Sequence, residues 1–219
     1  MDLFDALPAL RKHDLFGDKK VSLVGVSTIV HDRAAYYFEV GKPKFWSRRE
    51  DGVTGVGIGG IGGKIERGEG VWACLRREAR EELGVRVRLE LPDQTYLLNE
   101  WRVVDQIHLK PSKKRPIPLI VILMPPRLGG PLAPDHLAIL AFKSRLRGQP
   151  APHDLLGLLR VKNEVLIDFF AREDWPLAQA QTLPGVTMTL NGELPANTVL
   201  RPKLTAHAFQ CLVQHSLPF

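Results

Sequence analysis

Three carboxylates with helical spacing, Glu78, Glu81 and Glu82, are the residues of this chain that most clearly suggest chemistry. Residues three and four apart in an α-helix lie on the same side of it. Clustered like charges are unfavourable unless a cation neutralises them. Because the donors are hard oxygen atoms and a glycine-rich loop precedes them, the segment predicts a site for Mg²⁺ or Mn²⁺ and a phosphate-bearing substrate.

A helix over residues 70–83 is the element that would position these carboxylates. Gly84 follows where a left-handed residue would end the helix. At about 100° per residue, one apolar stripe is formed by Val71, Leu75, Ala79 and Leu83. Glu78 and Glu82 lie at the edge of this stripe, so we expect them at the boundary of the core. The alternative is a solvated helix face with ion pairs between successive turns.

The same segment resembles the signature of the Nudix hydrolases, G-x5-E-x7-R-E-U-x-E-E-x-G-U, in which U is an aliphatic or small residue. Every specified position is filled, by Gly63, Glu69, Arg77, Glu78, Ala79, Glu81, Glu82, Gly84 and Val85. The complete signature favours the metal site over a solvated helix face.

The resemblance implies roles for individual residues. The metal ligands would be the carboxylates of Glu78, Glu81 and Glu82 and the backbone carbonyl of Gly62. Arg77 and Glu69 would form an ion pair that fixes the loop to the helix, and both are expected to support catalysis together with Glu81. Cations bound there neutralise a diphosphate and lower the pKa of a bound water molecule, so that water attacks phosphorus at neutral pH.

A further acidic residue is expected in the loop at residues 148–154. It resembles the Gly-Glu-Pro loop of family members that cleave nucleoside triphosphates, although Gln149 replaces the glutamate. Asp154 falls where those members carry an additional ligand or general base, and His153 lies beside it. The alternative is that Asp154 only caps the next element.

A different pattern overlaps this region. Gly57, Gly59 and Gly62 spell G-x-G-x-x-G, and Glu82 follows twenty residues later, as in a dinucleotide-binding fingerprint. In that motif the helix begins within the glycine run, whereas residues 63–68 intervene here. We interpret the glycines as permitting tight backbone next to metal and phosphate.

Three aromatic side chains and one cysteine could serve either the site or the core. Trp46, Tyr96 and Trp101 can stack a nucleobase, but core packing is the commoner fate of such residues. Cys74, one turn before Glu78, is expected to be a small buried helix residue rather than a ligand.

The composition indicates one ordinary globular domain with additions: 219 residues, 44% hydrophobic and 25% charged. A net charge of +6 favours anionic substrates and admits nucleic acid. One dense basic run comprises Lys110, Lys113, Lys114 and Arg115. It is either a solvated loop or a patch that binds phosphate or RNA, and no nucleic-acid-binding motif accompanies it.

Localisation follows from what the sequence lacks. It contains no long apolar span, no signal-peptide pattern and no cysteine framework. We therefore expect a cytoplasmic, reduced protein without a membrane partner. A homodimer is left open.

The fold implied by the resemblance is α/β: a Nudix-type α/β/α sandwich around a mixed β-sheet. We expect a single domain over residues 1–219, with an N-terminal arm (1–17), a core (18–182) and a C-terminal extension (183–219). An insertion at about 95–133 is read as a hairpin with the Lys/Pro loop at its tip. Hydrophobic patterning predicts helices at 70–83 and 163–171 and strands at 21–30, 34–40, 45–48, 53–58, 85–91, 95–99, 101–109, 117–124 and 186–190. The pattern of residues 136–147 suits a strand or a helix, and the resemblance to a Nudix strand that runs into a Gly-x-Pro loop implies a strand.

These expectations point to a metal-dependent pyrophosphohydrolase. Its substrate would be a nucleoside diphosphate linked to another moiety, cleaved by attack of water on phosphorus. The alternative is a regulatory module that binds a nucleotide metabolite with little turnover. The complete acidic set argues against that module, because a binder need not keep every metal ligand.

Overall fold

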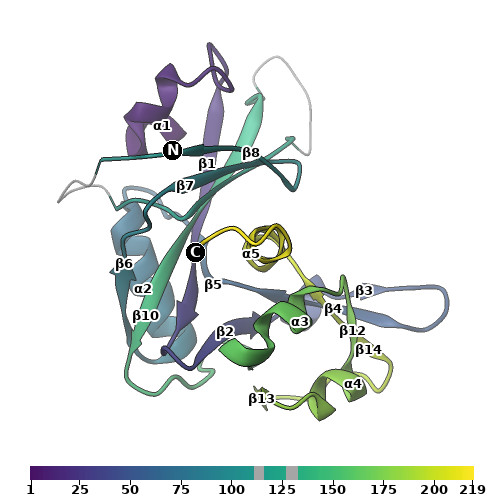
Figure 1. Ribbon diagram of the computed structural model, residues 1–219. Helices are drawn as coiled ribbons and strands as arrows, with labels where there is room; N and C mark the ends of the chain where they lie inside the picture. Colours follow the sequence, from purple (N-terminus) through teal and green to yellow (C-terminus); the bar gives the residue numbers. More distant parts are fainter. Residues whose placement is uncertain (111–115, 127–132) are drawn as a thin grey trace.

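The computed structural model describes residues 1–110, 116–126 and 133–219, and its centre is a large mixed β-sheet with helices on both faces (Figure 1). Two long strands, β1 (Val21–His31) and β10 (His136–Arg147), run parallel to each other. Most residues of β1 are buried regardless of the face on which they lie. This is the pattern of a strand covered on both sides. The predicted mixed α/β fold is confirmed.

Shorter strands extend the sheet from this central pair. Strand β2 (Ala35–Val40) returns antiparallel to β1, as the sequence predicted. The segment predicted as a strand at 45–48 instead forms a 3₁₀ turn at Pro43–Phe45, where proline fixes the first position, and only a two-residue strand follows. The other strands are β3 (Ser47–Arg48), β4 (Thr54–Gly59), β5 (Ile61–Lys64), β6 (Arg86–Glu90), β7 (Thr95–Asn99), β8 (Arg102–Ile107), β9 (Ile120–Met124), β11 (Gly157–Lys162), β12 (Trp175–Pro176), β13 (Val186–Leu190) and β14 (Thr198–Pro202).

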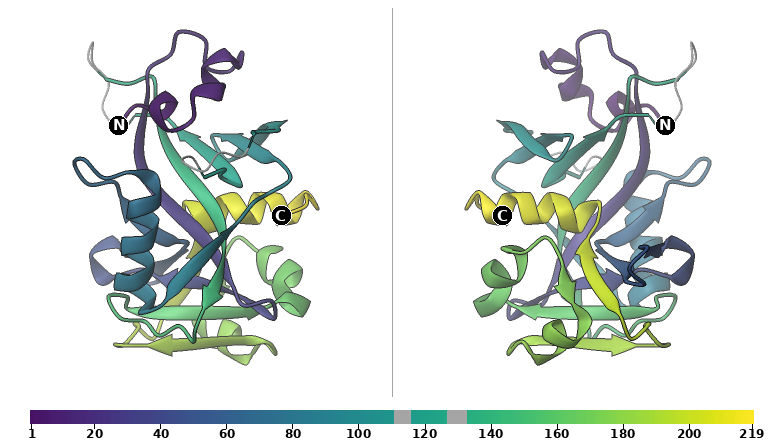
Figure 2. Two further views of the ribbon diagram at one scale, coloured as in Figure 1. Left: turned by 90° about the vertical axis from the view of Figure 1, so that its left-hand side faces the viewer. Right: turned by 90° about the vertical axis from the view of Figure 1, so that its right-hand side faces the viewer.

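The helices form the outer layers (Figure 2). Helix α2 (Val71–Leu83) covers one face, and α5 (Thr205–Gln214) lies on the other with the shorter α3 (Leu166–Phe170). Along α2, the predicted apolar stripe is turned inward, and the helix ends at Gly84 with φ +67°, a conformation that glycine adopts without strain. The remaining helical segments are α1 (Leu3–Ala6), α4 (Leu177–Thr182) and 3₁₀ turns at Pro8–Lys12 and Asn163–Val165.

Residues 183–219 contribute directly to the core. Strand β13 pairs with β11, and β14 pairs in parallel with β4. Phe209 of α5 is fully buried, and its ring lies against the rings of Tyr36, Phe38 and Phe170. The segment that the sequence marked only as an extension therefore supplies two strands of the sheet and the helix α5 that packs on one of its faces.

A hairpin forms within the segment predicted as an insertion. Strands β7 and β8 pair antiparallel, and their turn lies at Glu100 and Trp101, both with positive φ. Strand β9 then pairs in parallel with β7. Lys110 is exposed, but Lys113, Lys114 and Arg115, expected at the hairpin tip, lie outside the described residues, between β8 and β9.

Within the described parts of the chain, no helix combines the length and apolarity that crossing a membrane requires.

Candidate active site

Arg77, at the middle of α2, joins the glycine-rich loop to the helix. Its Nε donates to Glu69 Oε1 and its Nη2 to Glu69 Oε2, both at 3.0 Å, which is the two-bond geometry that a guanidinium offers a carboxylate. Nη2 also donates to the Lys64 carbonyl at 3.2 Å. Hydrogen bonding to Arg77 lowers the pKa of Glu69 to about 2. The expected ion pair is present, while its part in catalysis stays a prediction.

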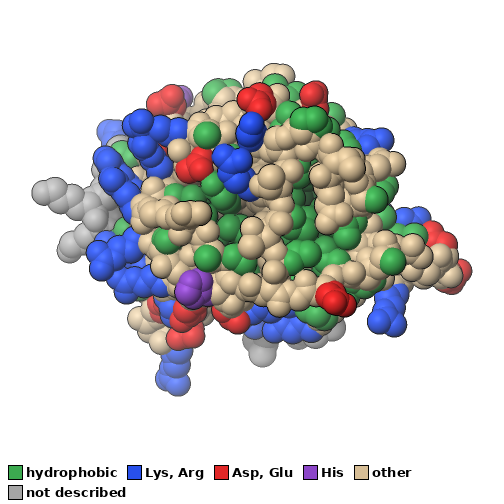
Figure 3. Space-filling view, turned by 90° about the horizontal axis from the view of Figure 1, so that it is seen from below, with side chains coloured by type: hydrophobic (Ala, Val, Ile, Leu, Met, Phe, Trp, Pro, Cys, Tyr) green, Lys and Arg blue, Asp and Glu red, His purple; other side chains and the backbone are tan. Residues whose placement is uncertain are grey.

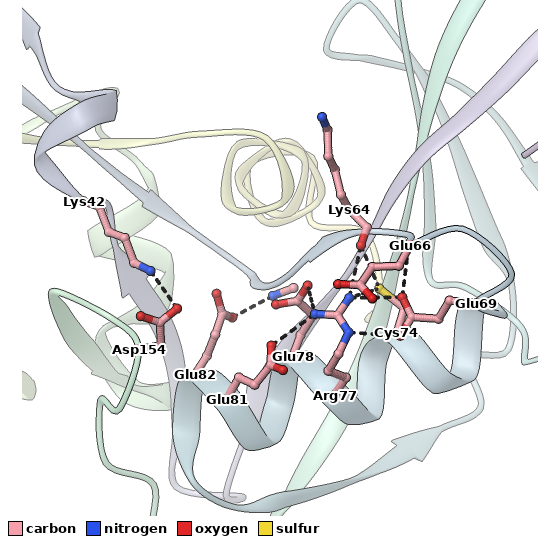
Figure 4. Close-up of polar contacts among 11 residues, drawn as sticks. Lys42, Lys64, Glu66, Glu69, Cys74, Arg77, Glu78, Glu81, Glu82 and Asp154 are labelled. Carbon is pink, nitrogen blue, oxygen red and sulfur yellow. Dashed lines mark hydrogen bonds and ion pairs between the residues drawn. The ribbon is translucent and has the colours of Figure 1, made fainter.

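The same guanidinium contacts two more carboxylates (Figure 4). Nη1 of Arg77 lies 2.8 Å from Glu78 Oε1 and 3.1 Å from Glu81 Oε2. The pKa of Arg77 is raised, first by its hydrogen bond to Glu69 and then by Glu78 and Glu81. One cation thus holds three of the four acidic residues of the signature.

Glu82, the fourth acid, takes part in none of the ion pairs found among residues 1–110, 116–126 and 133–219. Its side chain is buried, and Oε2 accepts a hydrogen bond from the Gly62 N–H at 2.9 Å. Burial raises the pKa of Glu82 to about 9, and the nearby charges of Glu39 and Glu78 add to the effect. Glu78 also has a raised pKa because of burial, although Arg77 opposes the shift.

Glycines bring the backbone of β5 directly against these acids. Gly62 has φ +155°, and a Cβ there would overlap the backbone of Val26 and Ser27 on β1. A Cβ on Gly63 would overlap the carboxylate of Glu78. The glycines of the alternative dinucleotide pattern lie in β4 and β5 rather than at the start of a helix, and α2 begins only at Val71. They are therefore close-approach positions and not a dinucleotide-binding turn.

A carboxylate that the sequence analysis missed completes the cluster. Glu39 lies on β2 opposite Gly59 of β4, and a Cβ on Gly59 would collide with its carboxylate. Burial raises the pKa of Glu39 to about 7; Lys42 opposes this shift and Glu78 adds to it. One signal was available: Glu39 is the sole charged residue of the strand Ala35–Val40.

The donor set fits a hard divalent cation in its chemistry. Burial raises the pKa of Glu39, Glu78 and Glu82, and the neighbouring carboxylates add to the rise in each case, so a bound cation would favour their ionised forms. In the described parts of the chain, however, no three acidic, histidine or cysteine side chains converge closely enough to hold an ion as they stand. The reason is visible in the contacts: Glu78 and Glu81 turn to Arg77, and Glu82 turns to Gly62. Ion binding would compete with these partners.

The loop that carries Asp154 caps the C-terminal end of α2. The N–H groups of Ala151, His153 and Asp154 donate to the carbonyls of Leu83, Glu82 and Glu81 at 3.1, 2.9 and 3.0 Å, respectively. These carbonyls are among those that a helix C-terminus leaves without partners. The loop therefore fixes Asp154 beside the acidic side of the helix.

The Asp154 side chain is exposed and accepts a hydrogen bond from Lys42 Nζ at 2.9 Å (Figure 4). That bond lowers the pKa of Asp154. Backbone N–H groups do the capping, and the carboxylate pairs with Lys42. Its role as a ligand or base stays a prediction.

The remaining candidates divide between core and surface. Tyr96 is fully buried and its hydroxyl donates to the Pro218 carbonyl, so it is a core residue. Trp101 stacks on His207 with ring centroids 4.5 Å apart. Trp46 is half-buried and donates to the Gly41 carbonyl, next to Lys42. Cys74 is buried, as expected.

Comparison with known proteins gives the class. The NUDIX domain family matches residues 41–154, which is just over half of the chain and includes the whole signature. The chain belongs to the Nudix family. It is a pyrophosphohydrolase of that class, acting on small nucleotide derivatives. No curated protein matches it.

Several solved structures are similar at low identity. A hydrolase of the NUDIX family from Clostridium perfringens has 17% identity and a TM-score of 0.39, over 66% of this chain and 83% of its own. The E. coli ORF135 protein has 15% identity and a TM-score of 0.36, over 68% and 79%. A MutT protein from Bacillus halodurans has 15% identity and a TM-score of 0.32, over 66% and 71%. The family assignment rests on the domain match.

Proposed function

We propose that the protein cleaves a diphosphate linkage in a nucleoside diphosphate joined to another moiety, by attack of water on phosphorus, with Mg²⁺ or Mn²⁺ as cofactor. The observation that carries this proposal is the convergence of three carboxylates on glycine backbone: Glu39 lies against Gly59, Glu78 lies against Gly63, and Glu82 accepts the Gly62 N–H. When ionised, they bring three negative charges together. A diphosphate would be repelled by that charge unless cations stand between them.

The ion-binding residues in this proposal are Glu78, Glu81, Glu82 and the Gly62 carbonyl, with Glu39 as an additional oxygen donor. When bound, the metal neutralises the diphosphate and makes a water molecule acidic enough to attack. Ion binding would draw Glu78 and Glu81 away from Arg77, which contacts both of them here. The bond of Arg77 to Glu69 keeps the loop closed on α2.

Lys42 and Asp154 stand at the exposed edge of this cluster. Lys42 would bind a phosphate oxygen of the substrate, because its partly exposed ammonium stands at the edge of the carboxylates, paired with Asp154. Displaced from Lys42, Asp154 would be available to accept a proton from the attacking water.

A nucleotide-sensing module with little turnover is the second candidate. It is favoured by one observation: Arg77 occupies Glu78 and Glu81, so the described side chains do not form a ready three-ligand site.

One experiment separates the two candidates. Purified protein is incubated with nucleoside diphosphate derivatives, dinucleotides and nucleoside triphosphates, with Mg²⁺, with Mn²⁺ or in excess EDTA, and released nucleoside monophosphate and phosphate are measured. We expect turnover that needs the cation and incorporates ¹⁸O from labelled water into a phosphate product. Tight binding without turnover would support the sensing module, and full turnover in EDTA would contradict the metal.

A further inference from the structure

A groove lies on the side of α2 turned away from the carboxylates. Its volume is about 300 Å³, and it is lined by Trp72, Arg76, Arg80, Arg86 and Val87. The first three repeat every four residues and so share one side of the helix. At about 100° per residue, that side is roughly 140° away from Glu78 and Glu82. The groove is therefore separate from the candidate active site.

The arginines of this groove have no acidic partners. None of the ion pairs within the described residues includes Arg76, Arg80 or Arg86. The segments outside the description, 111–115 and 127–132, contain no Asp or Glu. The Arg76 guanidinium lies 4.3 Å from the centre of the Trp72 ring, which holds its planar face in the groove.

More arginines lie at the same edge of the sheet, on β6 and β10, where they alternate with Val87 and Leu146, which pack on the α2 side, and so point to the opposite face. Arg86 of β6 lies directly opposite Arg147 of β10, and Arg88 lies directly opposite Arg145. Like charges at facing positions of paired strands are destabilising. These residues also take part in none of the ion pairs named above. Figure 3 shows Lys and Arg side chains gathered along the side of the molecule on which α2 and β6 lie in Figure 1.

We propose that this arginine surface, made of Trp72, Arg76, Arg80 and Arg86, binds a single strand of nucleic acid. Guanidinium groups form two-bond contacts with phosphate and stack on bases through their planar face. Three arginines along one groove, with further arginines around the neighbouring sheet edge, suit a chain of phosphates rather than one small anion. The Arg76–Trp72 stack offers a platform for an unpaired base, which an acidic peptide would leave unused.

The binding test uses the full chain and fluorescein-labelled 20-nucleotide RNA and DNA of mixed sequence, with fluorescence anisotropy between 50 and 200 mM salt. The test variant carries Arg76→Gln, Arg80→Gln and Arg86→Gln. The matched control removes three exposed cations that also lie outside the ion pairs: Lys12→Gln, Arg48→Gln and Arg102→Gln. Thermal unfolding of all three proteins checks that they fold.

We expect the test variant to bind at least tenfold more weakly than the wild type. Each phosphate contact contributes about 0.7 to the slope of log K against log salt for a single strand, so losing three contacts should reduce that slope by about 2. The control should keep the wild-type slope. Absence of binding by the wild type, or equal slopes in the two variants, would overturn the proposal.

Two competitors test whether the groove instead prefers a small anion or an acidic protein. If tripolyphosphate displaced the strand at the same phosphate concentration, the groove would be a small-anion site; if poly-glutamate bound more tightly than RNA, the partner would be an acidic protein. Either outcome overturns the proposal. Hydrogen exchange of the wild type supplies a readout without any variant, because bound RNA should protect peptides of α2 and β6.

The same proteins distinguish this proposal from the proposed activity. Turnover of the best small nucleotide should be unchanged in the test variant, since the groove faces away from Glu78 and Glu82. If the wild type turned over nucleotide but did not bind RNA, only the proposal for the arginine surface would be contradicted, and the proposed activity would stand.

Discussion

Replacing Glu82 with Gln should make the protein more stable at neutral pH while abolishing most of its activity. Glu82 is buried, and its pKa of about 9 lies well above the ordinary value of 4.5. Between these two pH values the folded state binds a proton that the unfolded state releases. The stabilising contribution of this carboxyl is therefore fully present below about pH 4.5 and is lost as the pH rises through about 9.

The size of the effect follows from the same linkage. One additional bound proton changes the free energy of unfolding by about 1.4 kcal/mol per pH unit, so Glu82 alone accounts for a loss of about 4 kcal/mol between pH 5 and pH 8 as an upper bound. Glutamine has nearly the same shape, and its side-chain oxygen can still accept the Gly62 N–H. The Glu82→Gln substitution therefore removes the titration without removing the hydrogen bond.

The measurement is urea unfolding of wild type and Glu82→Gln in EDTA at pH 5, 6, 7 and 8. The wild type should lose stability steadily over this range, and the variant should lose less, so that the difference between the two proteins grows with pH. Glu81→Gln is the control, because its exposed carboxylate lies on the same helix. Parallel curves for wild type and Glu82→Gln would refute the burial argument.

The same substitution links stability to function. A ligand charge is lost, so kcat should fall by about 100-fold or more, which corresponds to about 3 kcal/mol of activation free energy. Mg²⁺ should raise the Tm of the wild type more than that of the variant, because bound cations relieve the charge at Glu82. Wild-type turnover by Glu82→Gln would show that the roles taken from the family signature are wrong at their centre.

Three further predictions concern the cation, Arg77 and Asp154. Turnover should require Mg²⁺ or Mn²⁺ and be highest at mildly alkaline pH, where the attacking water is easier to deprotonate; a pH series with and without EDTA measures this. Arg77→Lys should lower the free energy of unfolding by about 1–3 kcal/mol in urea titrations, because one ammonium cannot reproduce the two-bond contact with Glu69; unchanged stability would contradict that role. Asp154→Asn should lower kcat and alter the pH–rate profile with a smaller change in KM, whereas normal kinetics would leave Asp154 only as the partner of Lys42.

Local features of this protein were determined by the sequence alone. Helix α2 was predicted within one residue of its bounds, because the apolar stripe and Gly84 specify a helix and its end through contacts only a few residues apart. Strand β13 was predicted from its pattern with its observed bounds, whereas β10 needed the family resemblance to choose a strand over a helix. The acidic signature likewise lies within one loop and one helix, so its spacing was sufficient to indicate the family.

Tertiary structure decided what stands beside that signature. Glu39 joins Glu78 and Glu82 only because β2 pairs with β4 in one register, and Lys42 meets Asp154 across 112 residues of chain. Strand register and burial depend on the whole core rather than on neighbouring residues. For the same reason no local pattern indicated that α5 would pack on a face of the sheet, or that Arg86 of β6 would line a groove with the arginines of α2.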